Sequence, residues 1–311
     1  MKIQDMLGMI GGLSLFLFGM NMMSGGLEKI AGNHLEMILK KLTYNKWKAV
    51  FTGIVVTALI HSSSAMTVML IGFVNSGLMP LENAIWVVMG ANIGTTITGQ
   101  MLALDVGTLS PLLAFIGVIM FVFFKKEKMN YTGETIGGFG ILFMGLEIMS
   151  VSLMPLKDSS FFLSLLQWLS YPILGIFVGI IFTAIIQSSS ASIGILQSLA
   201  KMNLISLEKA TYIIFGFDIG TCITAFLASL SGSRSGKQLA LFHLLLNIFG
   251  AILFTLICLC TPFIEWVSML TPHLMMTQIA NMHTIFNVGT TVIALFFDRY
   301  LIQFIYKILP S

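Results

Sequence analysis

Charged residues are scarce in this sequence. Only 9% of its 311 residues are Asp, Glu, Lys or Arg, and 57% are hydrophobic, whereas a soluble domain carries roughly 25% charged residues. The charges gather in short strips, and the uncharged runs between them are long enough to cross about 30 Å of hydrocarbon as helices of roughly 20 residues. This pattern excludes a soluble globular domain and predicts a helical protein that crosses the lipid bilayer several times.

Cysteine is equally scarce, and its few positions exclude further classes. Cys222, Cys258 and Cys260 lie in or near apolar segments, and no His or Cys accompanies them at the spacing of a zinc site. A disulfide framework and a metal centre are therefore not expected. The Gly-x-Ser-x-Gly elbow of many serine hydrolases is absent, and the net charge of +3 reflects membrane orientation more than binding to nucleic acid. We expect neither an enzyme nor a nucleic-acid-binding protein.

Nine apolar segments can be drawn along the chain. The first is longer than the hydrophobic part of a typical signal peptide, which has about 7 to 15 residues, so we expect it to be retained. The segments cover approximately residues 7–27, 49–74, 82–104, 109–124, 135–154, 171–199, 207–230, 239–264 and 281–306.

Two strings within these segments are nearly the same. "TALIHSSSAMT" (residues 57–67) returns 126 residues later as "TAIIQSSSASI" (residues 183–193). The same offset aligns two more pairs of strings without a gap, which indicates an internal repeat. The further pairs are residues 11–24 with 137–150 and residues 81–98 with 207–224.

The positive charges of the loops indicate that the two repeats are inverted, because cytoplasmic loops carry the excess of Lys and Arg. The loop after the first segment has five lysines, whereas its equivalent in the second repeat has only Lys157. The loop after the third segment (residues 82–104) has no Lys or Arg, whereas the equivalent loop after residues 207–230 has Arg234 and Lys237. The sides are thus exchanged, and the C-terminus is predicted to be cytoplasmic. The five lysines are Lys29, Lys40, Lys41, Lys46 and Lys48.

The same assignment of sides constrains the segments that carry the serine motifs. The second and third segments together must make an odd number of crossings, so one of them should be re-entrant or broken. Inverted repeats with broken helices at the midplane are the architecture of many secondary transporters. We therefore predict an all-α polytopic membrane protein with two inverted-topology repeats whose broken or re-entrant helices meet at the membrane midplane. Residues 1–130 would form repeat 1, residues 131–264 repeat 2 and residues 265–311 a C-terminal transmembrane helix, all within one integrated domain.

The serine motifs themselves, residues 61–64 and 187–190, are candidates for a binding site. On an unbroken helix, successive residues point about 100° apart, so some of three consecutive hydroxyls would face lipid. A single Ser in a membrane helix is commonly a packing contact worth about 0.6 kcal/mol. A triple that follows His61 in one repeat and Gln187 in the other favours a function instead.

A second repeated motif is "GANIGTT" (residues 90–96) and "GFDIGTC" (residues 216–222). Each Gly lowers helix stability by about 1 kcal/mol, so we expect the backbone to open here. A broken helix offers N–H groups to an anion at one end and carbonyl groups to a cation at the other. Amide and hydroxyl oxygens suit a hard cation such as Na+. Asn92 and its equivalent Asp218 are therefore candidate cation ligands.

Ionisable residues inside membrane segments are functional candidates by default. Asp218 and His61 could each bind a cation or a proton, or be hydrogen-bonded polar residues that face the helix bundle. Two late pairs, His243 with Asn247 and His283 with Asn287, each lie four residues apart on one helix face. These pairs either line a cavity or form bonds between helices.

No Lys or Arg lies at the centre of an apolar segment. An anionic substrate at mid-membrane would then be held by hydroxyls, amides and helix ends, which carry only partial charges. Because burying an uncompensated charge costs many kcal/mol, co-bound cations are the expected compensation. Coupling to Na+ would then be a requirement of anion binding.

The doubled Ser motif, the "GANIGTT" string, the "LISLEKA" lead-in to its second copy and the two His-x-x-x-Asn pairs resemble the bacterial branch of the type II sodium-dependent phosphate cotransporters. The resemblance extends over about residues 11–287. It implies a secondary active transporter in the bacterial cytoplasmic membrane. Inorganic phosphate would be its substrate and Na+ its co-transported ion, with no organic cofactor. Many bacterial relatives also carry a C-terminal PhoU-like helical domain, and this sequence stops soon after the last apolar segment.

The resemblance also implies a central site for phosphate and Na+. The serine and threonine side chains would hold phosphate oxygens, and amide, carboxylate and imidazole groups would be candidates for Na+. The phosphate candidates are Ser62, Ser63, Ser64, Ser188, Ser189, Ser190, Thr95, Thr96 and Thr221, and the sodium candidates are Gln187, Asn92, Asp218 and His61.

The sequence departs from the family pattern at three positions. His61 stands in place of Gln, and Asp218 and Cys222 stand in place of Asn and Thr. An acid beside a phosphate site would repel the anion unless a cation or proton lies between them. If His61 titrates during transport, activity should vary between about pH 5 and 8.

Other functions agree with part of the same pattern. A transporter of another small anion, an H+-coupled phosphate exporter, an ion channel and a regulatory membrane protein are the alternatives. The motifs indicate neither the direction of transport nor an oligomeric state.

Overall fold

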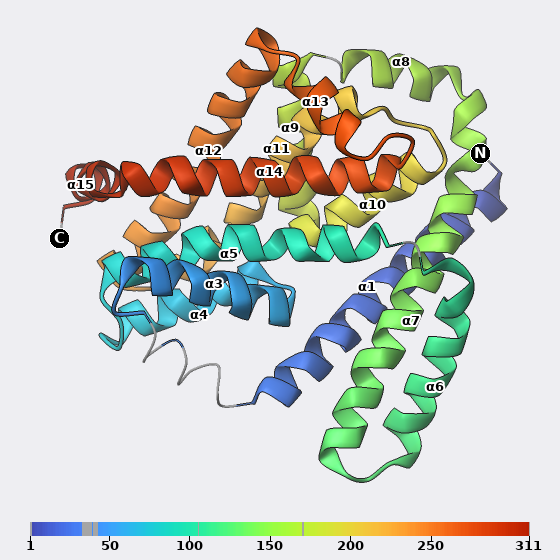
Figure 1. Ribbon diagram of the computed structural model, residues 1–311, viewed down its shortest axis with the longest axis horizontal. Helices are drawn as coiled ribbons and strands as arrows, with labels where there is room; N and C mark the ends of the chain where they lie inside the picture. Colours follow the sequence, from blue (N-terminus) through green and yellow to red (C-terminus); the bar gives the residue numbers. More distant parts are fainter. Residues whose placement is uncertain (1, 33–38, 40–42, 105, 170, 311) are drawn as a thin grey trace.

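The structure is a computed structural model that describes residues 2–32, 39, 43–104, 106–169 and 171–310. Within these ranges the chain is helical and contains no strand, which confirms the all-α class (Figure 1). The α-helices are α1 (Ile3–Ala31), α3 (Lys46–Ile60), α4 (Ser63–Asn75), α5 (Leu81–Leu102), α6 (Ser110–Phe123), α7 (Glu127–Leu153), α8 (Ser160–Trp168), α9 (Pro172–Ile186), α10 (Ser189–Lys201), α11 (Leu207–Ser229), α12 (Arg234–Cys260), α13 (Phe263–Leu270), α14 (Met275–Phe296) and α15 (Asp298–Ile308). Two short 3-10 helices cover Gly107–Leu109 and Met154–Asp158.

Several of these helices are long and apolar enough to cross a membrane. Among the described residues there are five such helices, or up to seven if each of two bent helix pairs counts as one span. The protein is therefore a multi-pass membrane protein, as the composition predicts. The five are α1, α11, α12, α14 and the run Glu127–Asp158, which begins with α7.

The first helices of the two repeats, α1 and α7, pack against each other in antiparallel directions (Figure 1). A Cβ atom on Gly12 would lie 2.9 Å from the carbonyl oxygen of Gly145, and one on Gly19 would lie 2.7 Å from that of Gly138. The offset of 126 makes Gly12 the equivalent of Gly138, and Gly19 the equivalent of Gly145. Equivalent helices that meet antiparallel are related by a two-fold axis across them, so the repeats are inverted.

Helices α3 and α5, in contrast, run parallel to each other. A Cβ atom on Gly90 of α5 would collide with the carbonyl oxygen of Val50 on α3, and one on Gly94 would lie 2.6 Å from that of Ile54. Residue numbers therefore rise together along the two helices. The chain reaches the start of α5 through α4, so α4 must return toward the side from which α3 entered.

The second repeat has the same arrangement. Gly216 and Gly220 of α11 approach the carbonyl oxygens of Ile176 and Ile180 on α9, which are the equivalents of Val50 and Ile54. Helix α10 is therefore also a returning arm. The predicted odd number of crossings is explained by two re-entrant helix hairpins, α3–α4 and α9–α10, and α5 and α11 make the crossing.

The arms of the hairpins have a length that reaches the middle of the bilayer. Helices α3 and α9 have 15 residues each, and α4 and α10 have 13 each. At 1.5 Å per residue the arms are roughly 20 Å long, about half of the 40 to 45 Å that a bilayer measures with its headgroups. The turn of each hairpin is thus placed near the midplane.

The expectation that the backbone opens at "GANIGTT" and "GFDIGTC" was wrong. Helices α5 and α11 run without interruption through both motifs. The glycines allow the backbones of neighbouring helices to touch, as small residues do at membrane helix interfaces. The breaks lie instead in the serine motifs.

Helices α12 and α14 occupy equivalent places around the two-fold axis. Helix α12 packs mainly on α11 and also on α4 and α5, whereas α14 packs mainly on α5 and also on α10 and α11. Because α4 is equivalent to α10, and α5 to α11, these two sets of contacts correspond. Exchanging the two halves turns the contacts of α12 into those of α14. Helix α14 lies beside α5 although about 170 residues separate the two in sequence (Figure 1).

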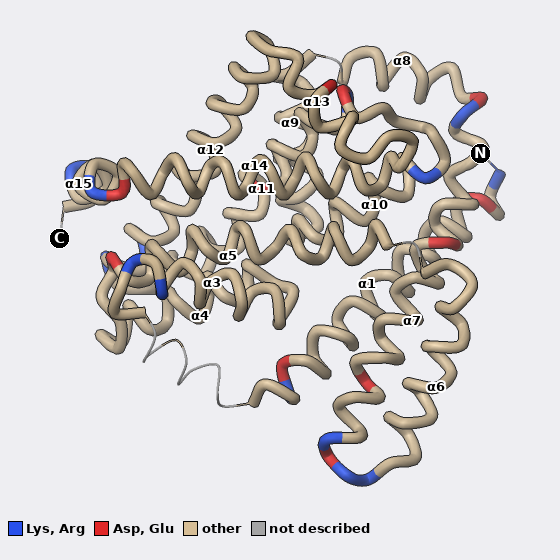
Figure 2. Tube along the Cα trace, in the orientation of Figure 1, with Lys and Arg blue, Asp and Glu red and all other residues tan. Residues whose placement is uncertain are grey.

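Most charged residues lie at helix ends and in the turns between helices (Figure 2). Lys46 at the start of α3 pairs with Asp298 at the start of α15, with 2.9 Å between Nζ and Oδ2. Lys125, Lys126 and Lys128 lie in and beside the turn between α6 and α7. Of the lysines used to assign sides, Lys40 and Lys41 lie outside the described residues.

The hairpin topology predicts which residues share a side of the membrane. In a chain with its three cysteines replaced by alanine, single cysteines at Tyr44 and Ser76 should react with an impermeant maleimide from one side, because they lie at the two ends of the α3–α4 hairpin. Cysteines at Tyr171 and Ser206 should react only from the other side. The measurement compares labelling in intact cells and in opened membranes. Labelling of Tyr44 and Ser76 from opposite sides would show that the hairpin crosses the bilayer.

Candidate functional site

The two serine motifs form the turns of the two hairpins. His61 (φ 52°) ends α3 and Gln187 (φ 61°) ends α9, both in the left-handed conformation that is uncommon for residues other than Gly. Ser62 and Ser188 then cap the next helices, because their hydroxyl oxygens accept the backbone N–H of the residue three positions later at 3.1 and 3.2 Å. The first Ser of each motif thus explains how the backbone leaves one helix and starts another.

The remaining serines present free hydrogen-bonding groups at the turns. Ser63, Ser189 and Ser190 are buried, and their hydroxyls have no hydrogen-bond partner in the part of the chain that the structure describes. The first N–H groups of α4 and α10 also lack partners within their helices, and the dipole of each helix makes this end positive. Such helix ends attract anions.

The two turns lie beside each other. The hydroxyl oxygen of Ser64 is 3.5 Å from the carbonyl oxygen of Gln187, which brings the N-terminus of α4 to the break in the opposite repeat. Gln187 is exposed, and His61, Ser62 and Ser188 are half-buried. Open backbone at membrane depth is tolerated where it is buried in protein or faces water, so we expect the exposed side of these turns to face water and not lipid.

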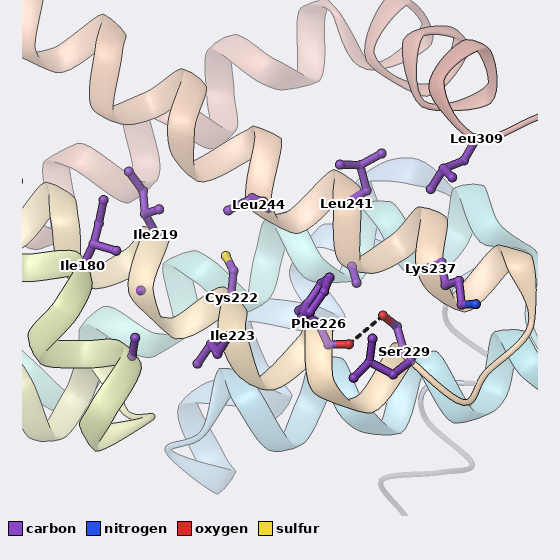
Figure 3. Close-up of a pocket in the computed structure, with 14 residues that line it drawn as sticks. Ile180, Ile219, Cys222, Ile223, Phe226, Ser229, Lys237, Leu241, Leu244 and Leu309 are labelled. Atoms are coloured by element: carbon purple, nitrogen blue, oxygen red, sulfur yellow. Dashed lines mark hydrogen bonds between the residues drawn. The ribbon is translucent and has the colours of Figure 1, made fainter. Parts of the chain in front are cut away.

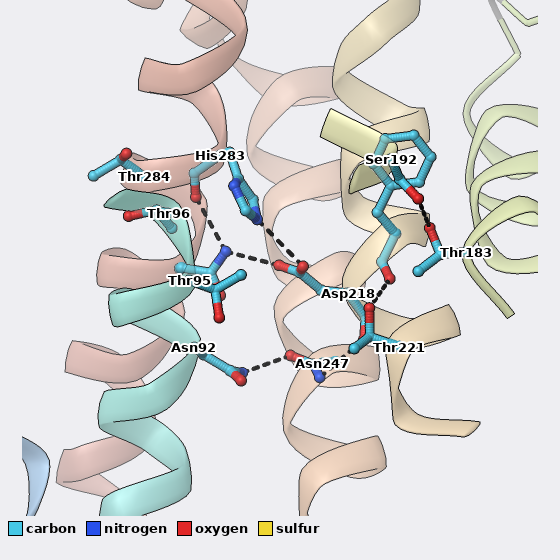
Figure 4. A network of polar contacts seen from close by, with 12 residues as sticks. Asn92, Thr95, Thr96, Thr183, Ser192, Asp218, Thr221, Asn247, His283 and Thr284 are labelled. Carbon is cyan, nitrogen blue, oxygen red and sulfur yellow. Dashed lines mark hydrogen bonds and ion pairs between the residues drawn. The ribbon is translucent and has the colours of Figure 1, made fainter. Parts of the chain in front are cut away.

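A chain of directed hydrogen bonds crosses from one half to the other (Figure 4). The Nε2–H of His243 donates to Oδ1 of Asn92 at 3.1 Å, and Nδ2 of Asn92 donates to Oδ1 of Asn247 at 2.8 Å. Nδ2 of Asn247 then donates to the backbone carbonyl of Asp218 at 3.1 Å and contacts Sγ of Cys222 at 3.2 Å. Asn247 is therefore the link between the equivalent residues Asn92 and Asp218.

Asp218 has its own pair of partners on α14. Oδ1 of Asp218 is 3.2 Å from Nε2 of His283, and Oδ2 accepts a hydrogen bond of 2.7 Å from Nδ2 of Asn287. All three side chains are buried. Each repeat thus places its Asn or Asp against a His-x-x-x-Asn helix, with a neutral amide in the first half and a carboxyl group in the second.

The threonines of the motifs donate their protons to their own helices. The hydroxyls of Thr95, Thr96 and Thr221 bond to backbone carbonyls at 3.0, 2.8 and 2.9 Å. Their oxygen lone pairs are therefore the groups left for a ligand, which suits a cation better than a phosphate oxygen. His61 is held by α5, because its Nδ1 lies 2.9 Å from Oγ1 of Thr98.

Within the described ranges, the second hairpin has a hydrogen bond across its break that the first lacks. Oγ1 of Thr183 donates to Oγ of Ser192 at 2.9 Å across the Gln187 break (Figure 4). The equivalent residues of the first hairpin are Thr57 and Met66, and the buried hydroxyl of Thr57 has no partner among the described residues. This bond rigidifies one turn and has no counterpart in the other.

The structure thus brings the predicted residues together in two groups. Ser62–Ser64 and Gln187–Ser190 meet at the hairpin turns, and Asn92 and Asp218 meet through Asn247. No hydrogen bond in the described chain joins the two groups directly, so their function as one site stays a prediction. The partners His243, Asn247, His283 and Asn287 were absent from the predicted set, although their repeated spacing was the signal that could have placed them in it.

Comparison with known proteins shows the family to which these residues belong. The profile of the family described as Na+/Pi-cotransporter matches residues 15–152 and 148–258. The chain belongs to the Na+/Pi-cotransporter family. The predicted family is thereby confirmed, and its members are transporters rather than enzymes.

Relatives of this cotransporter family member come from bacteria and mammals. The chain is 32% identical over 303 residues to the uncharacterized protein YqeW of Bacillus subtilis, with 95% of each chain covered. It is 28% identical over 249 residues to the putative inorganic phosphate export protein YjbB of Escherichia coli K12, and the match covers 80% of this chain and 46% of YjbB. It is 35% identical over 98 residues to the sodium-dependent phosphate transport protein 2A of Rattus norvegicus, 31% of this chain and 15% of that protein. No solved structure matches the chain.

The two equivalent centres predict different responses to loss of a histidine. His283→Ala should lower the free energy of unfolding by about 3 to 5 kcal/mol, because it leaves the buried Asp218 carboxylate without a partner for Oδ1. The matched change His243→Ala leaves only the neutral amide oxygen of Asn92 without its donor. It should lower the free energy of unfolding by about 1 to 3 kcal/mol. Adding Asp218→Asn to His283→Ala should restore part of the loss.

Unfolding in detergent, followed by circular dichroism, measures these differences. Asp218→Asn alone should be mild, because Asn92 already forms the corresponding contact with His243. If the double variant is no more stable than His283→Ala, the carboxylate does not cause the loss.

Proposed function

We propose that the protein is a secondary active transporter that moves inorganic phosphate together with Na+ by alternating access to the site at the two hairpin turns. The observation that carries this proposal is the meeting of two helix N-termini with unpartnered serine hydroxyls. The two hairpins enter from opposite sides, as in other transporters built from inverted repeats. Family membership supports phosphate as the substrate.

Phosphate would be bound at the turns by neutral donors. The hydroxyls of Ser63, Ser189 and Ser190 and the first N–H groups of α4 and α10 can donate to phosphate oxygens. Ser62 and Ser188 accept from the backbone as caps, so their own hydroxyl protons are free to be donated. This set resembles a phosphate-binding nest built twice, once from each half.

Na+ would supply the charge that the protein lacks. No Lys or Arg occurs between Lys48 and Lys125 or between Lys157 and Lys201, so neither hairpin turn contains a Lys or Arg that could neutralise phosphate. The oxygen lone pairs of Thr95, Thr96 and Thr221 and the exposed Gln187 are suited to a hard cation. The polar chain from Asn92 to Asp218 would place a further amide and a carboxylate beside it.

Alternating access follows from the inverted arrangement. If the two halves exchange conformations, a site between them opens to one side of the membrane and then to the other. The asymmetries at His61 and Asp218 would make the two states differ in energy. In a bacterial cell this cycle would take place in the cytoplasmic membrane, with the C-terminus inside.

A second candidate is phosphate export, with H+ in place of Na+. It is supported by the similarity to YjbB, a putative inorganic phosphate export protein, and by the histidines at both centres. The two candidates share the phosphate site and differ in the coupling ion and in the direction of the gradient that drives transport.

Flux measurements separate these candidates. In proteoliposomes that contain the purified chain, labelled phosphate should accumulate when a Na+ gradient is imposed and should not when K+ replaces Na+. A pH gradient imposed without Na+ tests the proton-coupled alternative. Equal phosphate uptake with and without the Na+ gradient would remove Na+ coupling, and no saturable phosphate flux in any gradient would remove the transporter itself.

Serine variants test the location of the phosphate site. Ser63→Ala and Ser189→Ala should each raise the KM for phosphate by roughly 10- to 100-fold, because a hydrogen bond to a charged group contributes about 1.5 to 3 kcal/mol. Ser198→Ala is a matched control, since Ser198 is equally buried in α10 but bonds to the carbonyl of Gly194 at 3.1 Å. Transport at the wild-type KM in both turn variants would place the phosphate site elsewhere.

A further inference from the structure

An apolar pocket of about 470 Å³ opens between α9, α11 and α12 (Figure 3). Ile219, Phe226, Leu241 and Leu244 are among its lining residues. Phe226 is exposed, and the other three are half-buried. All three helices belong to the second repeat, and Leu309, just after α15, is also part of the lining.

The pocket has the length of one membrane leaflet. Its lining along α11 and the residue that follows it runs from Ile219 to Leu230, eleven steps that rise by about 16 Å along a helix. One leaflet contributes about half of the 30 Å hydrocarbon core. An extended apolar chain that enters from the membrane surface would therefore reach the deep end of the pocket.

A positive charge marks one end of the pocket. Lys237 is the one charged residue that lines it among the described residues, and it lies at the end opposite Ile219 and Ile180 (Figure 3). Arg234 is one turn away at the start of α12, where the helix dipole is also positive. Both side chains are exposed on the side that the loop charges assign to the cytoplasm.

The equivalent place in the first half is polar instead. The offset of 126 makes Gln100 the equivalent of Phe226. Aligning His243 of α12 with His283 of α14 makes Asn281 and Thr284 the equivalents of Leu241 and Leu244. Nε2 of Gln100 donates to Asn281 at 3.2 Å and to Thr284 at 2.9 Å. The same fold can therefore close this position with hydrogen-bonded side chains, and the apolar lining is particular to the second half.

We propose that this pocket binds one acyl chain of an anionic phospholipid from the cytoplasmic leaflet, with its headgroup phosphate paired with Lys237. The apolar lining suits the chain, the leaflet length suits its depth, and the charge at the pocket mouth selects an anionic headgroup. Basic residues near a membrane surface attract anionic lipid by about 1 kcal/mol each.

A lipid in the pocket would affect the hydrogen-bonded link between Asn92 and Asp218. Cys222 lines the pocket, and its Sγ is 3.2 Å from Nδ2 of Asn247, the link between Asn92 and Asp218. An acyl chain packed against Cys222 would restrict α11 and α12 where they hold this link. The lipid would therefore act on the transport cycle without touching phosphate.

Native mass spectrometry of the purified full-length chain tests the lipid site. With phosphatidylglycerol and phosphatidylcholine offered in equal amounts, the wild type should retain one phosphatidylglycerol. Lys237→Gln should weaken its retention about fivefold and remove the preference over phosphatidylcholine. Lys307→Gln, a basic residue that does not line the pocket, is the matched control and should leave the preference unchanged.

Filling variants test the chain-binding part independently. Leu244→Trp from α12 and Ala184→Leu from α9 should each abolish the retained lipid, whereas Leu256→Trp, an exposed position of α12 outside the pocket, should not. A thermal unfolding transition confirms that each variant is folded. Unchanged retention in both filling variants, or equal retention of the two lipids by the wild type, would overturn the proposal. Because lipid binding is measured without transport, this outcome is separate from the proposed function.

Discussion

Backbone N–H and C=O groups cannot stay unpaired in hydrocarbon, and this constraint organises the centre of the molecule. At each hairpin turn the chain leaves the helix, the His or Gln takes a left-handed conformation, and the following Ser caps the next helix. The donors that remain after capping are satisfied by water or a ligand. The two turns lie against each other, and α5 and α11 pack on the hairpin arms through glycine contacts.

Much of this arrangement could be predicted from the sequence, because a repeat carries long-range information. The offset of 126 paired the motifs, and the lysines of the loops showed that the halves are inverted. The need for an odd number of crossings then required a re-entrant segment in each half. The position of the breaks at His61 and Gln187 was within reach as well, since three hydroxyls in a row do not suit an unbroken helix in lipid.

The predictions failed or fell short where packing overrides local preference. The Gly residues of "GANIGTT" destabilise an isolated helix, but in α5 they gain contact with the backbone of α3. That gain depends on a neighbour that helix propensity does not include. The partners of Asn92 and Asp218 were left out of the predicted site, and the reason is similar. His243 and His283 lie far away in sequence, and neither belongs to the gapless part of the repeat that revealed the other residues.

The place of α14 has a consequence for how the chain is made. Helix α14 covers α5 and supplies the partners of Asp218. The partners of Asn92 come from α12. Synthesis at about 5 to 20 residues per second leaves roughly 200 residues, or about 10 to 40 seconds, between the emergence of α5 and that of α14. During this interval the side of α5 that α14 covers lies in the membrane without its final neighbour, and Asn92 lacks its partners until α12 has emerged. The nascent first half therefore depends on the insertion machinery or on water until α12 supplies the partners of Asn92 and α14 covers α5.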